Sequence, residues 1–260
     1  MKKLMAAAAV AACGVALAVE SSNIVGYAGN GVAAQEWNLV GLPFVDVGGS
    51  NGIAFDKILS MANVPAVSYD DASAGLGAEL QVRDELGGYT SYYYINDAEN
   101  KDGDYVTGWA DGDGYLLDGT TKLDSGSGVW LRLASATGVS FTFSGEVESA
   151  QSVDGDFING WTIMSSPYPV MLNLGNVTTE GVSAVSYDDA FAGLGAEIQV
   201  RDAQGLYTSY YYINDAENTN GDYVTGWADG DGYLVNTGVI PLGSAFWMRS
   251  PSAGTLVFSL

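Results

Sequence analysis

The chain contains no histidine, and its only cysteine is Cys13. The absence of histidine excludes Ser-His-Asp and Cys-His nucleophilic sites and any zinc site with a histidine ligand. A glycine-rich phosphate loop between a strand and a helix is also missing. A carboxylate pair is the remaining option for catalysis, with Asp70-Asp71 and its repeat Asp188-Asp189 as the best candidates. Because neighbouring residues of a strand point to opposite faces, such a doublet cannot flank one bond, and we predict no enzymatic activity.

Basic residues are scarce, since 9 lysines and arginines face 31 aspartates and glutamates and the net charge is −22. A surface of this charge repels phosphate backbones and anionic lipids, which argues against nucleic acid or a membrane surface as partner. Solubility or a salty medium explains the charge as well as a cationic partner does. Arg83 and Arg201, each in the tetrapeptide QVRD, are expected to pair with local aspartates rather than with a ligand.

Long apolar runs are confined to the N-terminus. Lys2 and Lys3 precede an apolar segment that closes on Ala16-Leu17-Ala18, which is typical of a secretory signal over residues 1–18 and is too short to span a membrane. The alternative is a lipid anchor at Cys13, because Val10-Ala11-Ala12 before it has the small-residue pattern of bacterial lipoproteins. Cleavage after Ala18 would remove the only cysteine and leave 7 basic against 31 acidic residues, a net charge of −24.

Repetition is the most conspicuous feature that the sequence does have. The segment YTSYYYINDAEN occurs at Tyr89 to Asn100 and again at Tyr207 to Asn218, and residues 66–115 and 184–233 agree at 43 of 50 positions without a gap. Weaker similarity on both sides gives each copy a tryptophan near its start and a Trp-x-Arg segment near its end. We predict a first module at residues 19–147, a linker at 148–159 and a second module at 160–260, because Ser, Asp and Gly cluster at the joint.

The local pattern within each copy is that of an all-β protein. Short segments rich in Val, Tyr, Ile, Trp and Thr alternate with Gly/Asp/Asn clusters, and one stretch, Ile53–Ala62, has a helical apolar face. We therefore predict two tandem β-sandwich-like modules, or small barrels, after the signal peptide. The strands predicted in the first copy are Asn38–Val45, Val64–Tyr69, Glu79–Arg83, Tyr89–Ile95, Tyr105–Trp109, Val129–Leu133 and Ser140–Ser144.

The aromatic run has two interpretations. Side chains alternate along a strand, so the run places aromatic rings on both of its faces. These rings either form a core or leave one face as an exposed platform on which sugar rings can stack. The ligand-binding candidates on the second interpretation are Tyr92, Tyr94, Trp109, Tyr210, Tyr212 and Trp227.

Acidic, glycine-rich loops follow the aromatic run in both copies. Oxygen ligands at this density suit Ca²⁺, although neither an EF-hand nor a calcium β-roll pattern is present. Tight turns between strands use the same Asp-Gly and Asn-Asp pairs, so turn chemistry is the alternative. The candidate metal ligands are Asp97, Glu99, Asp102, Asp104, Asp111, Asp113, Asp215, Glu217, Asp222, Asp229 and Asp231.

Four short motifs together resemble a loose group of secreted β-rich repeat proteins from environmental Gram-negative bacteria. They are the segment WNLVGLPF (Trp37 to Phe44), the tyrosine-rich strand, the Gly-Trp-x-Asp turn (Gly108 to Asp111) and the Gly-x-x-Phe-Trp-x-Arg ending (Gly243 to Arg249). The mature N-terminus of such proteins also often looks like VESSNIVGY (Val19 to Tyr27). The resemblance implies export and an all-β fold, and it implies no established activity.

The sequence thus predicts a secreted or cell-surface protein that binds an extracellular glycan, with Ca²⁺ assisting. Two copies of one site would gain avidity if both were engaged together. The alternative is a structural surface protein whose copies assemble into a layer or filament.

Overall fold

The computed structural model describes residues 25–32, 36–45, 52–55, 64–117, 119–134, 139–148 and 150–260. Strands dominate these residues and helices are few, which confirms the predicted all-β class. The signal peptide and most of the predicted helix Ile53–Ala62 lie outside the described residues.

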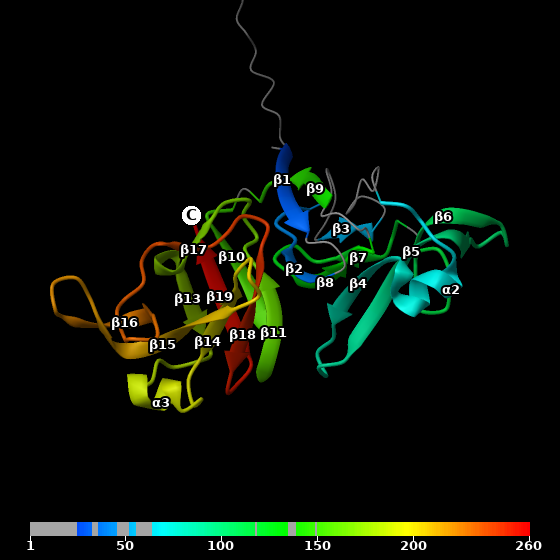
Figure 1. Ribbon diagram of the computed structural model, residues 1–260. Coiled ribbons are helices and arrows are strands. Elements are labelled where there is room, and N and C mark those ends of the chain that lie inside the picture. The colour runs from blue at the N-terminus through cyan, green and yellow to red at the C-terminus, as the bar shows by residue number, and fades with distance from the viewer. Residues whose placement is uncertain are drawn as a thin grey trace, which may run out of the picture.

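The elements occur in a similar order in the two halves of the chain (Figure 1). The first half contains β1 (Val25–Val32), β2 (Trp37–Gly41), β3 (Ile53–Ala54), α2 (Tyr69–Asp71), η1 (Ala72–Leu76), β4 (Ala78–Arg83), β5 (Tyr89–Glu99), β6 (Tyr105–Ala110), β7 (Lys122–Leu123), β8 (Gly128–Arg132) and β9 (Val139–Glu146). The second half contains β10 (Ser152–Phe157), β11 (Gly160–Ser165), β12 (Leu172–Asn173), η2 (Leu174–Asn176), β13 (Val177–Glu180), α3 (Tyr187–Phe191), β14 (Glu197–Arg201), β15 (Tyr207–Glu217), β16 (Tyr223–Ala228), β17 (Gly238–Ile240), β18 (Ala245–Ser250) and β19 (Gly254–Ser259). We call these halves the first and the second unit.

Each unit is built on a five-stranded antiparallel sheet. The strand order is β2-β8-β4-β5-β6 in the first unit and β11-β18-β14-β15-β16 in the second, so the two sheets have equivalent strands at equivalent places. The register is equivalent too: Leu80 pairs with Tyr92 in one sheet and Ile198 pairs with Tyr210 in the other. The duplication seen in the sequence is therefore a duplication of strand pairing.

Smaller sheets accompany the large ones. In the second unit β10 and β13 both pair with β19, and side chains of this three-stranded sheet share one core with the five-stranded sheet, as Phe157, Leu256 and Phe258 do with Ile198 and Phe246. In the first unit β1 pairs with β9 and β3 with β7. Each unit has its own core, because no buried residue of one main cluster comes from the other unit.

Three predicted segments differ in the structure. Residues 148–159, predicted as a linker, contain β10, which pairs with β19 and makes the second unit begin before Gly160. The predicted strand Val64–Tyr69 keeps only one bridge, at Val67, because Ser68 caps α2 by accepting a hydrogen bond from the Asp71 backbone N–H. Ile53 and Ala54, predicted as the start of a helix, form the short strand β3.

The nearly identical part of each unit forms a small core of its own. In the first unit Ala72, Ile95, Ala98 and Ala110 are buried together, and Tyr69 packs against them. Tyr69 is held from two sides, because its N–H donates to Asp97 and its hydroxyl donates to the Gly112 carbonyl oxygen. The second unit repeats this cluster and both bonds with the equivalent residues. The loops are thus tied to the strands in the same way in both copies.

Candidate functional site

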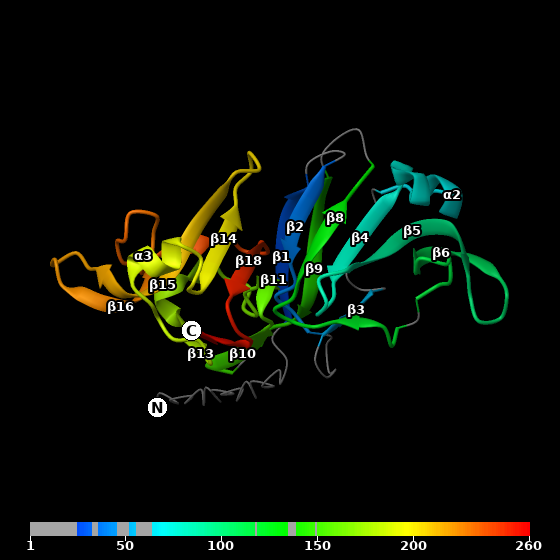
Figure 2. The same cartoon turned by 90° about the horizontal axis from the view of Figure 1, so that it is seen from below.

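The two large sheets face each other through the sides that do not contribute to the main cores. In β8, Val129 and Leu131 point into the first core, so Gly128, Trp130 and Arg132 point to the opposite side. The strands β2, β8, β11 and β18 of the two units lie in contact at the centre of the molecule (Figure 2). We call this contact region the junction.

Backbone contacts across the junction come in reciprocal pairs. The Gly41 N–H donates to the Gly243 carbonyl oxygen at 2.8 Å, and the Ser165 N–H donates to the Gly126 carbonyl oxygen at 2.6 Å. Gly41 is equivalent to Ser165, and Gly126 is equivalent to Gly243, by their places in the two units. Each unit therefore offers the other the same surface, as the subunits of a twofold-symmetric dimer do.

All four arginines of the chain lie at the junction, together with four of its six tryptophans. Within each unit, Arg132 lies 5.0 Å from the ring centroid of Trp37, and Arg249 lies 5.6 Å from that of Trp161. Cation–π contacts at these distances are favourable.

Two of the arginines form ion pairs with buried glutamates. Arg132 contacts Glu79 at 2.6 Å and Arg249 contacts Glu197 at 2.8 Å, and each glutamate side chain is only 8% exposed. Glu197 also accepts hydrogen bonds from the Gln199 amide at 2.8 Å and from the Ser209 hydroxyl at 2.7 Å. These bonds satisfy the carboxylates that the junction buries.

The other two arginines reach across to the opposite unit. Arg83 donates to the Trp161 carbonyl oxygen and lies 5.8 Å from the Trp247 ring, and Arg201 donates to the Trp37 carbonyl oxygen at 3.4 Å. The expectation that these arginines pair with local aspartates is wrong, because β4 and β14 carry them on the face that meets the other unit. Neither forms an ion pair within the described part of the chain.

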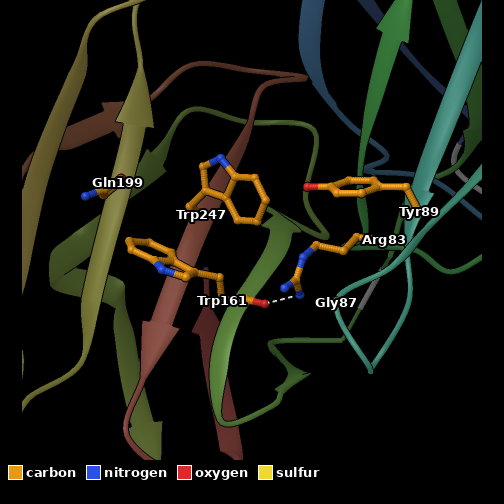
Figure 3. Close-up of a pocket in the computed structure, with 6 residues that line it drawn as sticks. All are labelled: Arg83, Gly87, Tyr89, Trp161, Gln199 and Trp247. Atoms are coloured by element: carbon orange, nitrogen blue, oxygen red, sulfur yellow. Dashed lines mark hydrogen bonds between the residues drawn. The ribbon is translucent and has the colours of Figure 1, made fainter.

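An open pocket of about 350 Å³ lies at the junction. Arg83, Gly87 and Tyr89 of the first unit line one side, and Trp161, Gln199 and Trp247 of the second unit line the other (Figure 3). The rings of Trp161 and Trp247 meet edge to face at 6.0 Å, and the Tyr89 side chain is 45% exposed. The described residues of the pocket wall therefore supply three aromatic rings, one guanidinium and one amide, and no carboxylate.

The polar groups of the pocket are held in place and still have free hydrogen-bonding capacity. The Gln199 Nε2 group donates to Glu197 and to Ser209, which leaves the Gln199 amide oxygen without a partner among the described residues. To the residues that the structure describes, the Arg83 guanidinium makes one hydrogen bond, to Trp161, so its other N–H groups are available as donors. The site can accept from a ligand hydroxyl and donate to a ligand anion.

The aromatic residues that the sequence offered as a platform lie elsewhere. Trp109 and Trp227 are buried in the two main cores, so neither indole offers a face to solvent. The remaining four, Tyr92, Tyr94, Tyr210 and Tyr212, are half-buried and pack against those cores. Burial, with a smaller contribution from the Asp111 and Asp229 carboxylates, raises the pKa of Tyr92 and Tyr210 above the ordinary value. These residues therefore belong to the cores, which is the first of the two interpretations of the aromatic run, and they do not form an exposed platform.

The acidic residues that the sequence offered as metal ligands are spread over several turns. Asp111 accepts hydrogen bonds from the Asp113 and Tyr115 N–H groups at 3.0 Å, and Asp229 makes the same two bonds in the second unit. Asn100 closes the turn that carries Asp102 and Asp104, and Asn218 does so for Asp222. Over the described ranges, no three or more His, Cys, Asp or Glu side chains gather where they could hold a metal ion. Binding of Ca²⁺ by these loops stays a prediction.

The aspartate doublets lie at helix starts. Asp71 and Asp189 accept from the hydroxyls of Ser68 and Ser186, which cap α2 and α3. Asp70 and Asp188 lie in the first turns of the same two helices. This is capping geometry with a favourable helix dipole.

The sequence did not single out Tyr89, Trp161, Gln199 or Trp247 as site residues. A usable signal was present, because Trp130 and Arg132, like Trp247 and Arg249, are two residues apart in a strand and must share a face that cannot be the core.

Comparison of the chain with protein-family models, curated proteins and solved structures finds no match. In the part of the chain that the structure describes, no helix has the length and apolarity needed to cross a membrane.

Proposed function

We propose that this protein is a secreted or cell-surface glycan-binding protein of two tandem β-sandwich-like modules, and that its junction pocket takes a sugar carrying a carboxylate. The observation that supports this most directly is the composition of the pocket wall. The described residues that line it supply three aromatic rings, a fixed amide and a guanidinium with no ion pair in the described part of the chain, and none of them is a carboxylate. This is a local excess of positive charge in a chain with a net charge of −22.

Each group has a role in binding such a sugar. The apolar C–H faces of a sugar ring pack against the rings of Trp247 and Tyr89, which supply large contact areas. The Arg83 guanidinium donates to the sugar carboxylate, and such charge-assisted bonds are stronger than neutral ones. The Gln199 amide oxygen accepts from a hydroxyl. Aromatic side chains with a few placed polar groups are common in small-molecule sites.

The negative charge of the whole protein opposes an anionic ligand only weakly at the pocket. At physiological ionic strength, exposed charges are screened over about 8 Å. The guanidinium is in the pocket wall itself, whereas Asp84 and Glu85 of the same hairpin line a second hollow and not this pocket. The local charge therefore decides which ligand is bound.

The test uses the mature chain, residues 19–260, in titration calorimetry. The probes are a uronic acid tetrasaccharide and a neutral glucose tetrasaccharide of the same length. We expect the uronic acid probe to bind and the neutral probe to bind more weakly. Arg83→Gln should weaken binding of the uronic acid probe about tenfold or more, because it removes a charged hydrogen bond.

The matched control is Tyr105→Ala, which removes a tyrosine that is 69% exposed and does not line the pocket. It should bind both probes as the unaltered chain does. Equal binding of the two probes, or loss of binding in the control and not in Arg83→Gln, would refute the proposal. Concentration-dependent assembly without binding of any probe would favour the structural alternative.

The prediction of Ca²⁺ at the acidic loops is tested separately, by a thermal melt in chelator, in Ca²⁺ and in Mg²⁺. A ligand at a hundred times its Kd stabilises the folded state by about 2.7 kcal/mol. A rise of Tm specific to Ca²⁺ would support metal binding, and an unchanged Tm would leave the aspartates with their role in turns.

A further inference from the structure

We propose that the junction carries a second site for the same class of acidic sugar, formed by Trp37, Gln81, Trp130, Arg201, Gly205 and Tyr207. This inference rests on the proposed function of the first pocket, of which the second site is the counterpart with the units exchanged. The chain would then bind two sugar residues, one on each side of the contact between Trp130 and Trp247.

The correspondence follows from the contacts and not only from the sequence alignment. Arg201 donates to the Trp37 carbonyl oxygen at 3.4 Å, as Arg83 does to Trp161. Arg201 lies 6.0 Å from the Trp130 ring centroid, and Arg83 lies 5.8 Å from that of Trp247. Each arginine thus reaches two strands of the opposite unit. It bonds to the backbone of the edge strand of the large sheet, β2 or β11, and lies near the indole of the neighbouring strand, β8 or β18.

The glutamine and the tyrosine of the second site resemble those of the first pocket in their hydrogen bonds and exposure. The Gln81 amide donates to Glu79 at 2.9 Å and to Ser91 at 3.2 Å, which leaves its oxygen without a partner among the described residues, as in Gln199. Tyr207 is 44% exposed and Tyr89 is 45% exposed, so both rings present a comparable face. Every aromatic, guanidinium and amide side chain of the first pocket therefore has an equivalent side chain in the second site.

A purely structural role for these residues does not explain why their guanidinium N–H groups take no carboxylate partner among the described residues. The junction is already held by the reciprocal backbone hydrogen bonds of Gly41 and Ser165, and the two buried ion pairs lie within the units. Arg83 and Arg201 are the arginines that take no carboxylate partner among the described residues, and each has an exposed tyrosine from its own hairpin beside it. At each end of the junction, guanidinium N–H groups that can still donate lie beside an exposed tyrosine ring. A ligand can bind to such a pair of groups.

The two sites differ in how tightly their walls are packed. Trp161 meets Trp247 edge to face at 6.0 Å, whereas the described contacts include no such ring pair between Trp37 and Trp130. The hydrogen bond from Arg201 is also long, at 3.4 Å. A less fixed wall loses more side-chain freedom on binding, so the second site should have the lower affinity.

The experiment counts sugar molecules bound to each chain by native mass spectrometry, with a uronic acid disaccharide as probe. The chains are residues 19–260 without substitution, Arg83→Gln, Arg201→Gln and the double variant. Tyr207→Ala serves as a second variant of the new site, because it changes an exposed ring and leaves the inter-unit hydrogen bond of Arg201. A thermal melt of each variant reports whether it folds.

We expect two disaccharides on the unsubstituted chain, one on each single variant and none on the double variant. Arg201→Gln should keep the tighter binding event, and Arg83→Gln should keep the weaker one. A single disaccharide on the unsubstituted chain, with binding unchanged in Arg201→Gln and Tyr207→Ala, overturns the second site and leaves the proposed function standing. Absence of binding to every chain overturns the proposed function itself.

Discussion

Replacement of Gly128 by alanine is predicted to push the two units apart. Gly128 lies where β8 meets the second unit, and a Cβ atom there would lie against Ile163 Cγ2, 2.6 Å from Ala245 Cβ and 3.2 Å from the Met164 carbonyl oxygen. The Ala245 Cβ is fixed by its paired strand, and the Ile163 Cγ2 has little freedom because a β-branched side chain is stiff at χ1. The strands themselves must move.

The expected loss of stability in Gly128→Ala can be estimated from the cost of overpacking. An extra methyl group in a well-packed contact lowers the free energy of unfolding by about 1–3 kcal/mol. For a chain of this size each kcal/mol lowers the Tm by about 2–4 °C. The assay is a thermal melt followed by tryptophan fluorescence, which reports the junction because four of the six tryptophans lie there.

The matched control is Gly112→Ala, since a Cβ atom at Gly112 has no atom within 4 Å and the backbone there is not left-handed. Its Tm should equal that of the unsubstituted chain or exceed it slightly, because alanine restricts the unfolded state. If Gly128→Ala melts at the same temperature as Gly112→Ala, the close contact of the units at the junction is refuted.

Two further predictions concern buried ionisable groups. Arg249→Leu removes the partner of the buried Glu197 carboxylate and should cost about 3 kcal/mol in a urea denaturation, whereas Lys101→Ala, at an exposed turn, should cost almost nothing. The raised pKa of Tyr92 and Tyr210 favours the neutral phenol in the folded state, so this contribution to stability is complete below the unfolded pKa of 10.0 and is lost as the pH rises through the folded pKa. Denaturation at pH 7 and above pH 10 should show the decrease, and unchanged stability over that range would contradict it.

The repeat and the strands of the large sheets could be predicted from the sequence, because their signals are local. Tyr89 to Ile95 alternates, bears β-forming side chains and ends in a turn sequence, and it forms most of β5. The segment around Ser68 could not be assigned in this way, since Val67 and Tyr69 favour a strand and the cap supplied by Ser68 decides for a helix. The strand β10 was missed because Ser152–Phe157 contains Asp and Gly and is a strand only through its pairing with β19.

The Trp-x-Arg spacing marks the face on which the candidate site lies, but local signals could not show the site itself, because two units build it. Arg83 and Trp161 are far apart in the sequence, and only the packing of one sheet face against the other brings them together. The repeated tyrosines drew attention to the wrong face of β5, since Tyr92 and Tyr94 complete the core while Tyr89, near the hairpin end, lines the pocket. The repeated sequence determines the strands of each unit, whereas the pocket forms only where the two units are in contact.

The measurement that tests the central proposal most directly is a crystal structure of residues 19–260 grown with a uronic acid disaccharide. The proposal predicts a sugar ring between Tyr89 and Trp247 with its carboxylate on the Arg83 guanidinium, and a second, less occupied sugar beside Arg201 and Trp130. An empty junction with the disaccharide bound at another surface, or bound nowhere, would contradict it.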